Sequence, residues 1–272
     1  MNKLNRNLLA IMQKVVMIAL CIMGSVLFTL SSCNLELKHD GKPDEPPKDA
    51  KIVTRSGDLA WDFPVKPGTE EWYLLETEDE RVAALQVPEE ILVSLSSDDI
   101  VRLSIEFPTF IFFTTSDTPQ AGFLLTLKWF NLYKQLLSKK GAGEKLLAAY
   151  KDADLSGFKT LPYSNKLWVL RLDYLELLLV QKEILQSLTP DECMELLLEA
   201  RKKTSEKINH EDFSLYGSQS SLRIMATILD AEGVSIPKGE IVTRLIETGV
   251  MGDISLIDEI TRATDNYFNA KK

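Results

Sequence analysis

Residues 167–180 read LWVLRLDYLELLLV, and this stretch decides the fold. Its only charged residues are Arg171, Asp173 and Glu176, which leave apolar side chains on nearly every face of a helix. A helix of that kind lies in the centre of its domain, because it has no polar face to turn toward water. Three charges in so short a stretch also argue against a membrane-spanning helix. We therefore expect a buried helix against which other helices pack.

Helix-start signals are found on both sides of this stretch. Thr77 with Glu80, and Thr189 with Glu192, have the spacing of a capping box, in which each side chain satisfies the other residue's backbone N–H. The helix that opens at Thr118 is expected to run to about Lys139. Other signals predict short helices that open near Thr69, Pro88 and Ser97, and longer ones over about 218–232, 238–248 and 254–268.

Composition points to the same fold class. Leucine fills 42 of the 272 positions and glycine only 13, which favours helices over a turn-rich β-sandwich. The single β-like run, residues 107–115, contains a proline and is short, so we expect a buried connector there. The sequence therefore predicts one all-α domain over residues 53–272, with about nine or ten helices in antiparallel pairs. Compact and solenoid-like packing both stay open, because no repeat is visible.

The amino-terminal residues have the pattern of an export signal. Three basic residues precede an apolar run over 15–30, which is shorter than a spanning helix requires. The run ends in Leu30-Ser31-Ser32-Cys33, which resembles the lipobox of bacterial lipoproteins. We therefore interpret residues 1–32 as a lipoprotein signal peptide and Cys33 as the lipid-attachment residue. An ordinary signal peptide or a retained anchor is the alternative.

A charged spacer follows the predicted lipidation site. Residues 34–52 contain three prolines and nine Lys, Asp or Glu residues, a composition that cannot bury an apolar face, so we interpret 33–52 as a flexible tether. Without residues 1–32 the chain has 28 basic and 40 acidic residues, a formal charge of −12. Nucleic acid is excluded as a partner, since phosphate binding needs a basic face. We expect the membrane to be engaged through the lipid, on the periplasmic side of the outer membrane, with the cell surface as the alternative.

Residues suited to catalysis or metal binding are few. The two histidines, His39 and His210, lie in the tether and in a polar turn, and Cys193 is the only cysteine after Cys33. Residues 152–157 (DADLSG) begin like a calcium-binding loop, but the twelfth position is Tyr163, where a carboxylate is required. The sequence therefore predicts no catalytic residue, no metal site and no cofactor.

Four aromatic residues near the start of the domain are the only candidate ligand-binding residues. They are Trp61, Phe63, Trp72 and Tyr73. Such side chains either bind a sugar or peptide or fasten an irregular amino-terminal arm to the helices, and the second role is the more common.

A resemblance to a known group covers nearly all of residues 57–268. The segments 61–72 (WDFPVKPGTEEW), 86–89 (QVPE) and 95–101 (LSSDDIV) resemble a group of exported proteins of gut-type Bacteroidota, and the likeness continues through Phe107-Pro108, 120–123, 146–150 and 220–226. The resemblance implies an all-helical exported domain and implies no activity. At 111–113 this chain has IFF, which is more apolar than the group's pattern.

Three hypotheses about function follow. The first is a non-enzymatic lipoprotein of the cell envelope, a helical binding or scaffold module whose partner is an envelope protein or a glycan. The second is a carbohydrate- or peptide-binding accessory protein that uses the four aromatic residues. The third is an enzyme that works with carboxylates alone, which would need two acids with separated pKa values in one cleft.

Overall fold

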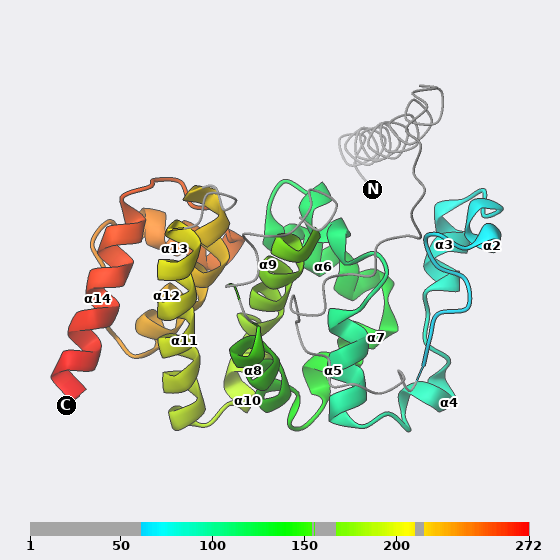
Figure 1. The fold of residues 1–272 in the computed structure, drawn as a ribbon, viewed down its shortest axis with the longest axis horizontal. Helices are drawn as coiled ribbons and strands as arrows, with labels where there is room; N and C mark the ends of the chain where they lie inside the picture. The colour runs from blue at the N-terminus through cyan, green and yellow to red at the C-terminus, as the bar shows by residue number, and fades with distance from the viewer. Residues whose placement is uncertain (1–60, 154, 156–166, 210–214, 272) are drawn as a thin grey trace, which may run out of the picture. The chain divides into compact units, whose positions relative to one another are not determined.

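The computed structural model describes residues 61–153, 155, 167–209 and 215–271. Within these ranges the chain forms thirteen α-helices, two 3-10 helices and no strand, and every described residue belongs to the same compact unit (Figure 1). Contacts between elements far apart in sequence, such as α6 with α13 and α5 with α9, distinguish this packing from a solenoid. The all-α prediction is confirmed, with a few more helices than the predicted nine or ten. Residues 1–60, and with them the predicted signal peptide and tether, lie outside the described part.

The helices follow one another with short connections. The first half contains α2 (Glu70–Tyr73), α3 (Glu78–Ala84), α4 (Glu89–Leu92), α5 (Ser97–Ile105), η1 (Phe110–Thr115), α6 (Pro119–Trp129), α7 (Asn131–Ser138) and α8 (Ala142–Asp152). The second half contains α9 (Leu167–Leu179), α10 (Lys182–Ser187), α11 (Pro190–Ile208), η4 (Leu215–Ser218), α12 (Gln219–Ala231), α13 (Gly239–Thr248) and α14 (Leu256–Lys271).

The predicted capping boxes form. Thr77 accepts a hydrogen bond from the Glu80 amide at the start of α3, and Thr189 accepts one from the Glu192 amide at the start of α11. Each glutamate in turn accepts from the threonine's backbone N–H, and this bond holds the pKa of both carboxyls below the usual value. Helix α5 begins at Ser97 as expected, and the preceding residue, Ser96, caps it through a further capping box with Asp99.

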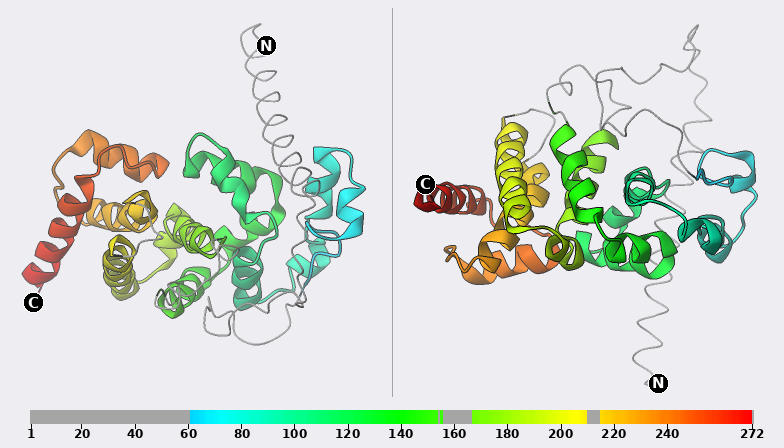
Figure 2. Two further views of the ribbon diagram at one scale, coloured as in Figure 1. Left: turned by 45° about the horizontal axis from the view of Figure 1, so that its top comes forward. Right: turned by 90° about the horizontal axis from the view of Figure 1, so that it is seen from below.

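Helix α9 is the central element that its sequence predicted. Leu172 and every residue from Tyr174 to Val180 are buried. Helix α9 lies between α6 and α12 (Figures 1 and 2), and it also contacts α5, α8, α10 and η1. No helix in the described ranges has the length and apolar character needed to cross a membrane.

The helix expected from Thr118 to about Lys139 is two helices, so that prediction is wrong. Phe130 separates α6 from α7, with an extended backbone at φ −116° and ψ 125°. Its side chain is buried and its ring centroid lies 4.8 Å from that of Phe107. An unbroken helix would turn residue 130 in another direction, so aromatic packing in the core favours the break.

Two side-chain amides hold the chain at this break, and that of Gln86 bonds the backbone on both sides of Phe130. Gln86 donates to the Trp129 carbonyl at 2.9 Å and accepts from the Asn131 N–H at 3.2 Å. Asn131 in turn donates to the Val87 carbonyl at 2.7 Å and accepts from the Val87 N–H at 3.1 Å. This clasp fixes the angle between α6 and α7 by tying both to the segment that follows α3.

The expected buried connector over residues 107–115 is confirmed, and most of it is the 3-10 helix η1. Phe110 and Phe113 are buried, and η1 packs directly on α6. A Cβ atom on Gly122 of α6 would lie 2.4 Å from the Phe113 carbonyl oxygen. Only glycine therefore permits this close approach.

Truncating a leucine of α9 tests the central position of this helix. Leu178 is fully buried, so Leu178→Ala should lower the free energy of unfolding by about 2–5 kcal/mol, through lost transfer energy and the cavity left behind. The matched control is Leu198→Ala, since Leu198 is 53% exposed on α11. Urea denaturation measures both variants, and equal effects would contradict the central role of α9.

Removing the Asn131 amide tests the clasp. Asn131→Ala takes away both partners of the Val87 backbone, and a polar group left unsatisfied costs about 1–3 kcal/mol. We expect a loss of that size in denaturant unfolding. Lys134→Ala, at an exposed position of the same helix, should leave stability almost unchanged. If the clasp did not contribute to stability, the unfolding curves of Asn131→Ala and Lys134→Ala would superimpose.

Candidate functional site

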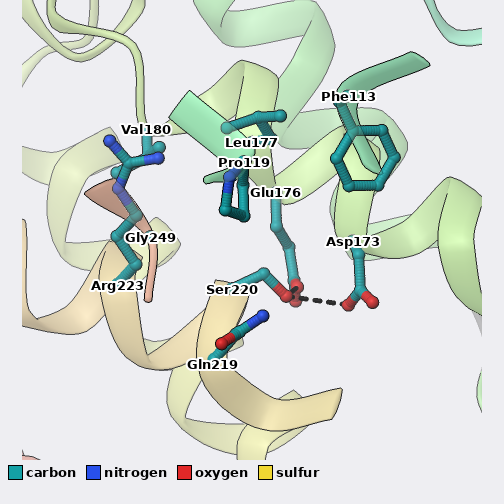
Figure 3. A pocket seen from close by; sticks show the side chains of 10 residues that line it. All are labelled: Phe113, Pro119, Asp173, Glu176, Leu177, Val180, Gln219, Ser220, Arg223 and Gly249. Atoms are coloured by element: carbon teal, nitrogen blue, oxygen red, sulfur yellow. Dashed lines mark hydrogen bonds between the residues drawn. The ribbon is translucent and has the colours of Figure 1, made fainter. Parts of the chain in front are cut away.

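A small pocket lies where α9 faces α12 (Figure 3). Its volume is about 40 Å³, and η1, the start of α6 and the residue after α13 close its sides. Ten residues line the pocket. Helix α9 contributes Asp173, Glu176, Leu177 and Val180, and α12 contributes Gln219, Ser220 and Arg223. The remaining three are Phe113, Pro119 and Gly249. The α9 residues are three, four and seven positions apart, so they share one helix face.

A buried ionic cluster forms the acidic end of the pocket. The ammonium group of Lys207, from α11, lies 2.6 Å from Glu176 Oε2 and 3.0 Å from Asp173 Oδ1. Lys207 and Glu176 are fully buried, whereas the Asp173 side chain is 20% exposed. Burial alone would lower the pKa of Lys207, but the two carboxylates outweigh it and raise that pKa.

Two hydroxyl groups complete the cluster. Tyr150 of α8 donates to Glu176 Oε1 at 2.6 Å, and burial raises the pKa of this tyrosine well above its usual value. The Ser220 hydroxyl is close to both Asp173 Oδ1, at 2.8 Å, and Glu176 Oε2. Because a hydroxyl has one proton, Ser220 donates to one carboxylate at a time. Both oxygens of Glu176 are therefore hydrogen-bonded.

Arg223 lies at the other end of the pocket and has no acidic partner in the part of the chain that the structure describes. It donates to the Ile246 carbonyl at 2.9 Å and to Gln120 Oε1 at 2.7 Å, and only 6% of the residue is exposed. Its Nη1 is buried without a hydrogen-bond partner, and no carboxylate of the described residues lies within ion-pair distance. Burial lowers the pKa of Arg223 to about 10, so the side chain stays charged at neutral pH.

Ser220 and Lys207 do not form a nucleophile–base pair, because Lys207 is already protonated. Ser220 Oγ lies 3.3 Å from Lys207 Nζ, a spacing at which a neutral lysine could take the serine proton. The raised pKa keeps Lys207 protonated, and its ammonium is already shared between two carboxylates. The serine proton is directed to those same carboxylates, so the cluster joins α8, α9, α11 and α12 and has no free base. Within the described ranges, no group of three or more His, Cys, Asp or Glu side chains could hold a metal ion.

The four aromatic residues singled out in the sequence do not share one surface. Phe63 is 3% exposed and packs edge-on against Phe107, so it belongs to the core and is not available to a ligand. Trp61 and Trp72 are partly buried against the same core, whereas Tyr73 is 72% exposed. The structure therefore favours the fastening role for this arm, because three of the four rings turn inward.

Several other candidates lie at or beyond the limits of the described residues. Cys33, His39, His210 and most of the calcium-like loop lie outside them. At the described start of that loop, Lys203 Nζ donates to the Ala153 carbonyl at 2.6 Å, which places a buried positive charge where a calcium ion would meet repulsion. Cys193 is a free thiol whose pKa is raised by burial.

This site was not predicted from the sequence, although two of its residues gave a signal that could have pointed to it. Asp173 and Glu176 stood out as charges in an apolar helix, and buried carboxylates require a partner. Lys207, Ser220 and Arg223 gave no such signal, since each lies in a helix with an ordinary mixture of polar and apolar residues. The informative signal was the demand for a counter-charge, which does not reveal where in the chain that counter-charge lies.

Neutralising Lys207 tests the cluster. Lys207→Met leaves Glu176 buried beside an apolar side chain, and breaking a buried pair in this way costs about 3–5 kcal/mol. Adding Glu176→Gln removes the stranded charge and should restore much of the loss. The measurement is denaturant unfolding of both variants.

The matched control is Lys151→Met. Lys151 pairs with Glu195 at 2.8 Å on the surface, so its removal should hardly change stability. If Lys207→Met behaved like this control, the buried cluster would have no structural importance.

Comparisons with protein-family models, with curated proteins and with solved structures find no match to this chain. The resemblance to exported Bacteroidota proteins therefore stays a prediction.

Proposed function

We propose that this chain is a lipid-anchored protein of the bacterial cell envelope whose helical domain binds a partner and catalyses no reaction. The observation that carries the non-catalytic role is the pairing inside the pocket. Lys207, Glu176 and Ser220 are committed to one another, so none is available as a base or nucleophile.

The anchoring part of the proposal rests on the amino terminus. The lipobox-like Leu30-Ser31-Ser32-Cys33 supplies the thiol for lipidation, and two or more acyl chains hold a protein stably on a membrane where one does not. A mature charge of −12 gives no attraction to anionic lipid, so the lipid must supply the affinity. We place the protein on the periplasmic side of the outer membrane, with an envelope protein or a glycan as the partner.

The accessory-protein hypothesis stays second. Tyr73 and the neighbouring Leu74 are 72% and 77% exposed and could contact a sugar or a peptide. Stacking on a glycan usually requires a flat aromatic surface, and Phe63 is not part of one here. A carboxylate-dependent enzyme is less favoured, because Asp173 and Glu176 are both bonded to Lys207 and Ser220 within one cluster.

Removing the Cys33 thiol tests the anchoring. Cys33→Ala should convert a protein that partitions into the detergent phase into an unprocessed or soluble one, because acylation needs the sulfur. Detergent-phase partitioning and intact mass provide the measurement. Cys193→Ala is the matched control and should stay lipidated. Unchanged partitioning and mass for the Cys33 variant would overturn the lipoprotein proposal.

A further inference from the structure

Residues 70–80, which comprise α2 and the first turn of α3, concentrate the negative charge of the domain. These eleven residues contain six Asp or Glu side chains and no Lys or Arg, so their formal charge is −6. That is half of the formal −12 carried by residues 33–272. All six acidic residues are exposed, and no ion pair compensates any of them in the part of the chain that the structure describes.

The neighbouring basic residues are engaged elsewhere. Lys66 Nζ lies 2.6 Å from Asp62 Oδ1, and Arg81 donates to the Leu75 carbonyl at 2.6 Å. Glu80 accepts from the backbone in the capping box of α3, which leaves five carboxylates of the segment without a hydrogen-bond partner among the described residues. The helix dipoles offset only part of the repulsion between them, because α2 is a single turn of four residues.

Two large apolar side chains are exposed in the middle of the same segment. Tyr73 is 72% exposed and Leu74 is 77% exposed, the two highest values among the large apolar residues that the structure describes. Trp72 packs against the core. Glu70 precedes Tyr73 by three positions and Leu74 by four, so these three residues share one side of the helical turn. The segment therefore presents an apolar pair beside uncompensated carboxylates.

The charge of the segment selects among the surfaces that could cover the apolar pair. Anionic lipid and the same segment of a second copy would both be repelled. A glycan could stack on Tyr73, but its neutral hydroxyl groups would leave the charge of −6 uncompensated. A protein segment with Lys or Arg residues beside an apolar side chain compensates the charge and covers Tyr73 and Leu74 together.

We infer that residues 70–80 form the docking surface for a basic segment of a partner protein. Tyr73 and Leu74 cover an apolar side chain of that segment, and the surrounding carboxylates pair with its Lys or Arg residues. The inference rests on the proposed binding role of the domain and names the chemistry of the partner. Figure 1 shows α2 and α3 at one end of the molecule and α13 and α14 at the other, so the latter helices offer control positions far from this surface.

Photo-crosslinking in the cells that produce the protein tests the surface directly. The full chain carries the photoreactive residue benzoyl-phenylalanine in place of Tyr73, and mass spectrometry identifies the captured molecule and the crosslinked segment. The matched control carries it in place of Leu198, which is 53% exposed on α11. We expect position 73 to capture one protein, at a segment of net positive charge, with a yield at least about tenfold above that of position 198.

Several outcomes would overturn the inference. They are capture of lipid, of a glycan or of a second copy, capture of a protein at an acidic or neutral segment, and equal yields at positions 73 and 198. The Cys33→Ala partitioning test does not involve residues 70–80, so the anchoring proposal and this inference fail separately.

Removing four charges tests the role of the carboxylates. The variant, which keeps the photoreactive residue at position 73, combines Glu70→Gln, Glu71→Gln, Glu78→Gln and Asp79→Asn. Each amide has nearly the size of the acid that it replaces, so the apolar pair stays in place while the attraction to a basic segment is lost. The crosslinking yield should fall about tenfold. An unchanged yield would contradict the pairing of charges.

The matched control removes the same charge from exposed positions of α10, α13 and α14. It combines Glu183→Gln, Glu240→Gln, Glu247→Gln and Asp258→Asn. The yield at position 73 should stay that of the unmodified chain, because these residues lie outside the docking surface. An equal fall in both variants would assign the effect to the net charge of the whole protein and would contradict a local surface.

Discussion

The ion pair between Lys207 and Glu176 constrains the arrangement of the helices more than any other contact. Both side chains are fully buried, and moving a charge out of water costs several kcal/mol unless a partner stands close. Helix α9 therefore has to meet α11 at the register that brings these two groups within 2.6 Å. Tyr150 places a similar constraint on α8, because it donates to the other oxygen of Glu176, and Ser220 places one on α12 through its contacts with Asp173 and Glu176. Apolar contacts alone could be remade after a helix shifts by one turn. The ion pair of the buried Glu176 carboxylate could not, because the shift would separate it from Lys207.

The same constraint explains why a pocket exists at this place. Apart from Arg171, the other faces of α9 are apolar and pack closely, whereas on the face with Asp173 and Glu176 the carboxylates require polar neighbours. The polar groups of α11 and α12 occupy part of that face and leave a small space beside Arg223. A helix that organises the core thus supplies the wall of the candidate site.

The success of the sequence predictions depended on how local the governing interaction is. Capping at Thr77 and Thr189 involves residues three apart, and the burial of α9 follows from its composition, so both were predictable. The break at Phe130 depends on Gln86, whose side chain reaches across 43 residues to the Trp129 carbonyl. Likewise, Glu176 pairs with Lys207, which lies 31 residues further along the chain. A residue's need for a partner can be inferred from sequence, but the identity of a distant partner is decided by tertiary packing.

The choice of arginine at position 223 is itself informative. Two buried cations of this protein show opposite behaviour, because carboxylates raise the pKa of Lys207 whereas burial without a counter-charge lowers that of Arg223 to about 10. A lysine starts from a pKa of about 10.4, so comparable burial would bring its pKa toward neutral pH and make its charge depend on small changes in pH. Arginine starts high enough to remain a cation at neutral pH. The retained charge strengthens the hydrogen bonds that Arg223 donates to the Ile246 carbonyl and to Gln120, and these bonds join α12 to α13 and to α6.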